Sequence, residues 1–164
     1  MGALPEVQVL LQADHSERSA AQLHEGEAAE QVLIKSRAQI DYGFDKAFYA
    51  SSQDRICLPQ RERFTTPEVF YATALHELTH WAGHDSRLNR QFGQRFGDDA
   101  YAFEELVAEL GAAFTVGQLG MIDATVEAHV DYFNSWLRVL KNDKRAIFTA
   151  ASQAARAADF ILTC

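Results

Sequence analysis

The residues best suited to chemistry in this chain are the pentapeptide HELTH at positions 76–80, which lies in a stretch of helical character. Residues four apart lie on one face of a helix, about 6 Å apart along its axis. The imidazoles of His76 and His80 can therefore reach the same tetrahedral zinc ion. Glu77 projects from an adjacent part of that surface, where it can hold a water molecule rather than the metal. The pattern predicts two ligands, one general base and an open coordination position, as in a zinc hydrolase.

The alternative interpretation of this pentapeptide is two surface histidines that happen to flank a glutamate. Apolar or small residues surround the motif at Ala72, Leu75, Leu78 and Ala82, which indicates a helix that is half buried rather than fully exposed. A candidate third ligand also follows downstream. Both observations favour metal binding.

One candidate for the third ligand is a nearby histidine. Gly83 fits the pattern H-E-x-x-H-x-x-G-x-x-H, but Ser86 stands where that pattern needs its third histidine. His84 lies eight residues after His76, which corresponds to about 12 Å along a continuing helix. It can join the metal only if the chain bends back at Gly83. We therefore expect His84 at the surface or beside the ligands, rather than bonded to the ion.

The other candidates for the third ligand are glutamates of the next helix. Glu105 and Glu109 share a helix face, Glu104 precedes them, and mostly apolar residues surround all three. A buried carboxylate is costly unless it is paired or bound to metal. We assign Glu105 as the ligand and Glu109 as the acceptor for the free N–H of a ligand histidine. The alternative is that Glu104 and Glu105 are solvated charges at a helix N-terminus, where the helix dipole favours them.

The elements that must position these residues follow from periodicity and turn chemistry. Thr66, Pro67 and Glu68 form a strong helix start, and this helix should end near Gly83. A turn at 51–54 predicts a hairpin, extended to three strands by residues 39–42. The predicted strands are 39–42, 47–50 and 55–58, and the predicted helices are 27–37, 67–83, 101–119, 124–140 and 143–162. The fold class is α+β, with a small antiparallel sheet packed on a mainly helical half that carries the HExxH helix and a second, glutamate-bearing helix.

Composition limits the class of protein. The length of 164 residues fits one domain. The net charge of −8 gives little electrostatic reason to bind nucleic acid. No apolar run approaches the roughly twenty residues of a membrane span, and the start lacks a secretory signal. The two isolated cysteines, Cys57 and Cys164, favour a reducing cytoplasm.

Three blocks of this sequence resemble the ArdC-type antirestriction proteins. They are HELTHWAGHDSRLNR at 76–90, FGD at 96–98 with EELVAELGAAF at 104–114, and SWL at 135–137 with DKRAIF at 143–148. The likeness runs from about residue 40 to residue 161. It implies a zincin-like metallopeptidase domain whose ligands are the two histidines and a downstream glutamate, in agreement with His76, His80 and Glu105.

The resemblance also implies a larger context. In that family the peptidase domain usually follows a separate domain that binds single-stranded DNA, and nothing here resembles that domain. We therefore expect residues 1–164 to be a single domain from a longer protein, with residues 1–39 forming an N-terminal extension and helix. The expected partner is a protein or peptide substrate, with DNA reached only through the separate domain. No membrane is expected, and the oligomeric state stays open.

The predicted mechanism activates water with zinc. Glu77 would take the proton of the water and later pass it to the leaving amine. The oxyanion also needs a hydrogen-bond donor. We predict His129 and Tyr132, which share a helix face, as catalytic residues for this purpose, with Tyr101 as a further candidate. The alternative for each is packing in the core.

The rival hypothesis is a binding module that retains zinc without proteolysis. Such a module would recognise a restriction enzyme, another protein or DNA. Basic residues in the loop and near the last helices would supply a basic face, although such charges are usually just solvated. These residues are Arg87, Arg90, Arg95, Arg138, Lys141, Lys144 and Arg145.

Overall fold

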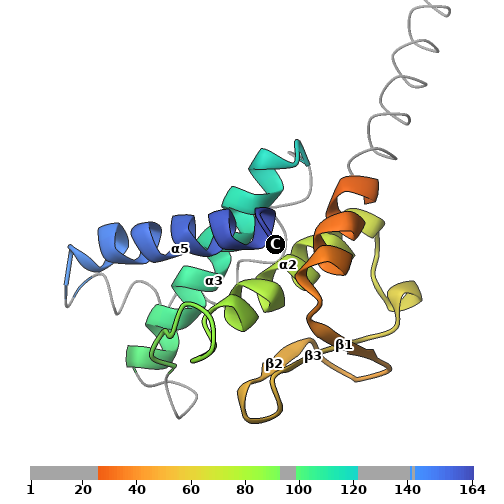
Figure 1. The fold of residues 1–164 in the computed structure, drawn as a ribbon, viewed down its shortest axis with the longest axis horizontal. Helices are drawn as coiled ribbons and strands as arrows, with labels where there is room; N and C mark the ends of the chain where they lie inside the picture. The colour runs from red at the N-terminus through yellow and green to blue at the C-terminus, as the bar shows by residue number, and fades with distance from the viewer. Residues whose placement is uncertain (1–25, 93–98, 122–140, 142) are drawn as a thin grey trace, which may run out of the picture.

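The computed structural model describes residues 26–92, 99–121, 141 and 143–164 (Figure 1). A helical segment over residues 26–36 comes first, close to the predicted 27–37. The elements that follow are β1 (Gln39–Tyr42), β2 (Phe48–Ala50), the 3-10 helix η1 (Ser51–Gln53), β3 (Arg55–Leu58), the 3-10 helix η2 (Arg61–Arg63), α2 (Pro67–Ala82), α3 (Asp99–Gln118) and α5 (Ala146–Leu162). This is the predicted α+β fold.

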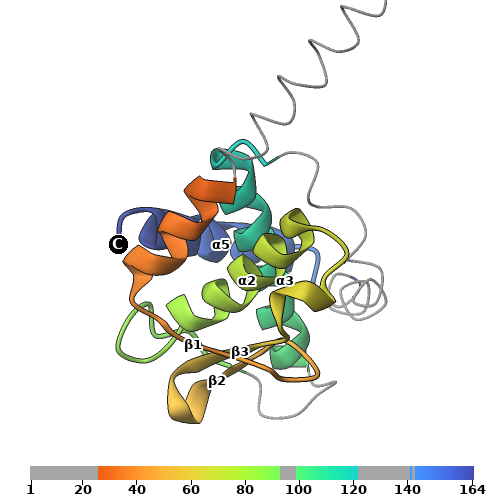
Figure 2. The same cartoon turned by 90° about the vertical axis from the view of Figure 1, so that its right-hand side faces the viewer.

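Helix α2 occupies the middle of the molecule. Figures 1 and 2 show the sheet on one side of α2 and the pair α3 and α5 on the other. Its apolar residues Phe70, Leu75 and Leu78 are buried in the main core cluster, which also contains residues of the sheet, of α3 and of α5. The helix that carries the HExxH motif is therefore fixed on two sides.

The sheet is mixed, which corrects the prediction that it is antiparallel. Its strand order is β1-β3-β2, with β2 antiparallel and β1 parallel to β3. The most buried strand takes the centre, because Ile56, Cys57 and Leu58 have no exposed surface. Since β2 and β3 form the predicted hairpin, β1 must use the other edge of β3. Gly43 lets the chain turn directly after β1, because it has a φ of 103°, which an L side chain rarely adopts.

The sequence signals at both ends of α2 act as predicted. The Thr66 hydroxyl accepts a hydrogen bond from the Val69 backbone N–H at 3.3 Å, and Pro67 occupies the first turn. At the other end the Gly83 N–H donates to the His80 carbonyl at 2.8 Å. The helix therefore begins and ends where its caps require.

The two later helices pack closely on α2 and on each other. Helix α3 is buried on almost every side from Ala102 to Ala112, and α5 contributes a fully buried face that includes Ala150, Ala154 and Ala157. They confirm the helices predicted at 101–119 and 143–162, with starts shifted by two and three residues respectively. The helix predicted at 124–140 lies outside the described residues.

Every helix of the described residues is too short or too polar to cross a bilayer.

Candidate metal centre

Helix α2 places His76 and His80 side by side. Their ring centroids are 4.9 Å apart, as the spacing of four residues requires. Both side chains are largely buried, with 14% and 8% of their surface exposed. Two imidazoles are thus held together inside the protein rather than displayed on its surface, which excludes the alternative of two surface histidines.

Helix α3 brings Glu105 against both rings. The Nε2 atom of His76 lies 3.4 Å from Glu105 Oε2, and the Nε2 atom of His80 lies 3.4 Å from Glu105 Oε1. The three groups offer ligand atoms within 4.8 Å of one another. Two ligand atoms bonded at about 2.1 Å to one tetrahedral zinc would be roughly 3.4 Å apart. The separations therefore suit a shared metal ion.

Each histidine turns its other nitrogen to a second carboxylate of α3. His76 Nδ1 lies 3.3 Å from Glu109 Oε1, which places Glu109 where the sequence predicted it. His80 Nδ1 lies 3.1 Å from Glu104 Oε1. Proton donation at Nδ1 leaves the Nε2 lone pair of each ring directed toward Glu105, which is the tautomer that a metal requires.

Glu104 is the residue whose role the sequence did not reveal. It is 4% exposed, so it is not a solvated charge at a helix end. Arg90 binds it through two hydrogen bonds, from Nε to Oε2 at 3.0 Å and from Nη2 to Oε1 at 2.6 Å. The feature that could have revealed its role is that α3 is almost wholly buried, because every charge on a buried helix needs a partner.

The donor set fits a divalent cation. Four glutamates of the site are each less than one-tenth exposed, namely Glu77, Glu104, Glu105 and Glu109. The guanidinium of Arg90 is also buried and contacts Glu104. This leaves an excess of buried negative charge, which is costly unless a cation offsets it. Glu105 Oε2 is also buried without a hydrogen-bond partner among the described atoms. Two imidazoles and one carboxylate are a common zinc ligand set.

The close contact of histidines and carboxylates also shifts the pKa values of His80 and Glu105. Burial would lower the pKa of His80, but the carboxylates of Glu104 and Glu105 outweigh it and raise that pKa to about 9. Burial likewise opposes charge on Glu105, yet the two histidines lower its pKa. The site therefore stabilises positive charge between its carboxylates, whether protons or a metal ion carry it.

Glu77 lies near both histidines and near Tyr49 of β2. It is 6% exposed, and burial raises the pKa of its carboxyl, although both histidines oppose this. The backbone of Tyr49 in β2 also favours the charged form of this carboxyl and so lowers its pKa. Glu77 lines the same cavity as the two histidines and Glu105 but lies outside the candidate ligand group, as expected for a base beside the ligands.

A cavity of about 250 Å³ opens onto these groups. Strand β2 and its flanks form one wall, and α3 forms another. Tyr101 of α3 lies in the lining, together with Phe92. The full lining is Ala47, Phe48, Tyr49, Ser51, His76, Glu77, His80, Phe92, Tyr101, Glu104 and Glu105.

A polar network fixes the sheet wall of this cavity. Arg87 stacks on Trp81 with its guanidinium carbon 3.9 Å from the ring centroid. It forms two hydrogen bonds to Asp54, including a short one from Nη2, and Tyr49 donates to Asp54 at 2.7 Å. The end of α2 is thereby tied to the β2–β3 hairpin.

Several predicted residues are not part of this group. His84 lies outside both the metal-ligand group and the cavity lining, and its Nδ1 is 2.9 Å from the Ser86 hydroxyl. The reason is geometric, because the chain turns away after Gly83. The candidates His129 and Tyr132 lie outside the described residues.

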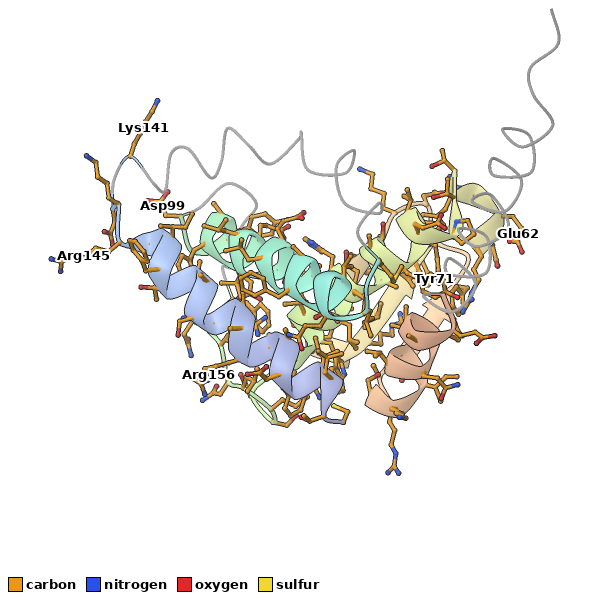
Figure 3. The ribbon with its side chains drawn as sticks, turned by 90° about the horizontal axis from the view of Figure 1, so that it is seen from above. Glu62, Tyr71, Asp99, Lys141, Arg145 and Arg156 are labelled. Atoms are coloured by element: carbon orange, nitrogen blue, oxygen red, sulfur yellow. The ribbon has the colours of Figure 1, made fainter. Side chains whose placement is uncertain are left out.

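Two arginines of the predicted basic face have largely buried side chains, with Arg87 12% exposed and Arg90 5% exposed. Arg87 and Arg90 are bound in the networks described above. Arg95 and Arg138 lie outside the described residues. Lys141 and Arg145 extend outward near the start of α5 (Figure 3).

Comparison with known proteins gives consistent matches. The family model of the zincin-like metallopeptidases matches residues 27–153. A DNA primase TraC of Escherichia coli is 44% identical over 137 residues, which are 83% of this chain and 13% of the primase. The uncharacterized protein y4eC of Sinorhizobium fredii (strain NBRC 101917 / NGR234) is 36% identical over 96% of this chain and 48% of its own length.

Solved structures give the same result. The crystal structure of the antirestriction protein ArdC from plasmid R388, in its Mn(II)-bound form, matches with a TM-score of 0.70 and 40% identity, over 85% of this chain and 51% of ArdC. The metal-free form matches with a TM-score of 0.68. These matches confirm the resemblance seen in the sequence. The chain spans about half the length of y4eC and ArdC and a far smaller part of TraC.

Proposed function

Because this chain belongs to the family of zincin-like metallopeptidases, we propose that it hydrolyses a peptide bond with the help of a zinc ion held by His76, His80 and Glu105. The observation that carries the proposal is the convergence of both Nε2 atoms on the Glu105 carboxylate at 3.4 Å. A zinc ion bound there would supply Lewis acidity, which polarises a carbonyl and makes a water molecule more acidic.

Glu77 is the proposed general base. Its burial raises the pKa of its carboxyl, which makes the carboxylate a better proton acceptor than an exposed glutamate. It lines the cavity together with both histidines and Tyr49 of β2. It would take a proton from the attacking water and return it to the departing amine.

The substrate is proposed to be an extended peptide in the cavity. Strand β2 forms one wall, and it pairs with β3 on one side only among the described strands. Its other edge offers backbone groups that an extended peptide can use as an added strand. Tyr101, which lines the same cavity, is a candidate donor to the oxyanion.

The proposed setting is that of the relatives. The protein of plasmid R388 is named for antirestriction, and we propose that this chain supplies the metallopeptidase part of a protein with a similar role. Its partner would then be a protein substrate. Residues from 29 to 161 share one core cluster, which supports a single domain over the described residues.

The test is Glu77→Gln, which preserves the shape of the side chain but removes its basicity. We expect the variant to bind zinc as the parent does and to lose hydrolysis of a broad peptide library by about 10²- to 10⁴-fold. Parent activity should vanish with a chelator and return with zinc.

The matched control is Glu62→Gln, because Glu62 is an exposed residue of η2 (Figure 3). It should cleave like the parent. Equal cleavage by Glu77→Gln would contradict the general-base role. Zinc binding without any chelator-sensitive cleavage would instead favour a non-proteolytic binding module.

A further inference from the structure

Two adjacent glutamates of α3 face the histidine pair, yet they are held in different ways. Glu105 faces the Nε2 atoms of both rings, and its Oε2 has no hydrogen-bond partner among the described atoms. Both oxygens of Glu104 are engaged by Arg90, and Oε1 also faces His80 Nδ1. A carboxylate with both oxygens bound in this way cannot turn to a metal without breaking charge-assisted hydrogen bonds.

Arg90 is itself anchored to the HExxH helix. Its Nη2 donates to the backbone carbonyl of Thr79, the residue before His80, at 2.6 Å. Its side chain is only 5% exposed. One guanidinium thus connects the backbone of α2 to a carboxylate of α3 beside a proposed ligand.

Gly83 supplies the space for this guanidinium. A Cβ atom at this position would lie 2.7 Å from both Cζ and Nη2 of Arg90. The φ of Gly83 is −80°, an ordinary helical value, so the backbone conformation does not require glycine. The glycine that follows the HExxH motif here makes room for Arg90.

We propose that Arg90 is a positioning residue for the metal centre: by clamping Glu104 it holds His80 with Nε2 toward Glu105 and keeps Glu104 out of the ligand set. The inference rests on the proposed metal site, but it concerns a residue outside the candidate ligand group and outside the lining of the cavity. Outer partners of ligand histidines commonly change metal affinity by 10- to 100-fold.

The experiment compares zinc affinity, by competition with a chromophoric chelator, in the parent and in Arg90→Met, Arg90→Lys and Gly83→Ala. We expect Arg90→Met and Gly83→Ala to bind zinc about 10- to 100-fold more weakly. Arg90→Lys should fall between Arg90→Met and the parent, because one ammonium cannot reproduce the two parallel hydrogen bonds. The visible absorption of the cobalt(II)-substituted protein should also change in Arg90→Met, because the ligand geometry changes.

The matched control is Arg156→Met. Arg156 is an exposed arginine of α5 (Figure 3) that lines a separate cavity near Arg90. Its removal should leave zinc affinity within twofold of the parent. Circular dichroism and thermal unfolding of the metal-free proteins separate loss of folding from loss of affinity. If Arg90→Met does not fold, the other two variants keep the test valid. Gly83→Ala leaves Arg90 in place, and Arg90→Lys keeps a positive charge at that position.

A double-mutant cycle tests whether Arg90 acts through Glu104. The variant Arg90→Met/Glu104→Gln should bind zinc no more weakly than the weaker single variant, because both changes break the same link. Folded Arg90 and Gly83 variants with parental zinc affinity and cobalt spectra would overturn the proposal, as would strictly additive losses. A parent protein that binds no zinc would instead overturn the proposed function, and this inference with it.

Discussion

At the scale of single residues, neighbouring side chains of one type have distinct surroundings. Glu104 and Glu105 differ because a guanidinium engages only the first. Glu77 and Glu105 differ because burial dominates the pKa of Glu77 and raises it, whereas two close histidines lower the pKa of Glu105. The role of each glutamate follows from its contacts, so the amino-acid composition alone could not assign that role.

The link between Asp54 and Arg87 predicts a pH-dependent contribution to stability. Hydrogen bonds from Arg87 lower the pKa of the Asp54 carboxyl. A group whose folded pKa is lowered stabilises the fold above its unfolded pKa of about 3.9 and loses that contribution as pH falls through the folded value. Asp54→Asn should therefore lower the free energy of unfolding at pH 7 by no more than about 1 kcal/mol, because Asp54 is 39% exposed and screened by solvent.

The measurement is urea unfolding of parent and variant at several pH values. The difference should shrink as pH falls below about 4. Asparagine tolerates the φ of 48° at this position, so the backbone is not disturbed. Asp45→Asn is the control, because that side chain is 99% exposed and should show no difference. A difference for Asp54→Asn that stays constant down to pH 2 would contradict the electrostatic explanation.

At the scale of elements, the crossing of α2 and α3 sets the distance between the histidines and Glu105. Gly111 of α3 lies against Thr79 of α2, where a Cβ would be 2.5 Å from Thr79 Cγ2. Thr79 is fully buried and its hydroxyl donates to the Leu75 carbonyl at 2.8 Å, so it has little room to move. Gly111→Ala should destabilise the protein by about 1–3 kcal/mol and weaken zinc binding by displacing α3.

Gly117 of the same helix is the matched control. Among the described residues, and apart from the neighbouring backbone of its own helix, nothing lies within 4 Å of a Cβ placed there. Gly117→Ala should therefore stabilise the protein by about 1 kcal/mol through helix propensity. Thermal unfolding and zinc titration of both variants provide the measurement. If Gly111→Ala is as stable as Gly117→Ala, the close crossing is not what positions Glu105.

Most elements could be predicted from local sequence, but the pairing of the strands could not. Thr66 and Pro67 mark the start of α2 because capping is a local interaction. Alternation and turn residues likewise predict the β2–β3 hairpin. Strand β1 is in a parallel pair because its neighbour is β3. Which strand takes the centre of the sheet depends on burial, and burial is decided by the packing of distant residues against β3.

The site was predictable to the extent that it follows helical periodicity. His76, His80, Glu105 and Glu109 lie where a spacing of four residues puts them. Arg90 comes from an irregular loop, where no period indicates which side chain turns inward. Its pairing with Glu104 is a contact across 14 positions, and a single sequence does not reveal it.

At the scale of the whole molecule, a buried cluster of charge in the middle of the fold should couple metal binding to stability. Zinc at 100 times its dissociation constant stabilises a protein by about 2.7 kcal/mol, which corresponds to a rise in Tm of roughly 5–10 °C for a domain of this size. Scanning calorimetry with zinc and with a chelator measures this shift. Glu105→Gln should show almost no response to zinc, and a full response in that variant would place the metal elsewhere.

The central claim is that His76, His80 and Glu105 bind one divalent ion together. Anomalous diffraction at the zinc absorption edge, from crystals of the zinc-loaded protein, tests it most directly. We predict one strong peak at about 2.0–2.2 Å from both Nε2 atoms and from a Glu105 oxygen. A zinc peak bound by other residues, with these three side chains unligated, would contradict the claim.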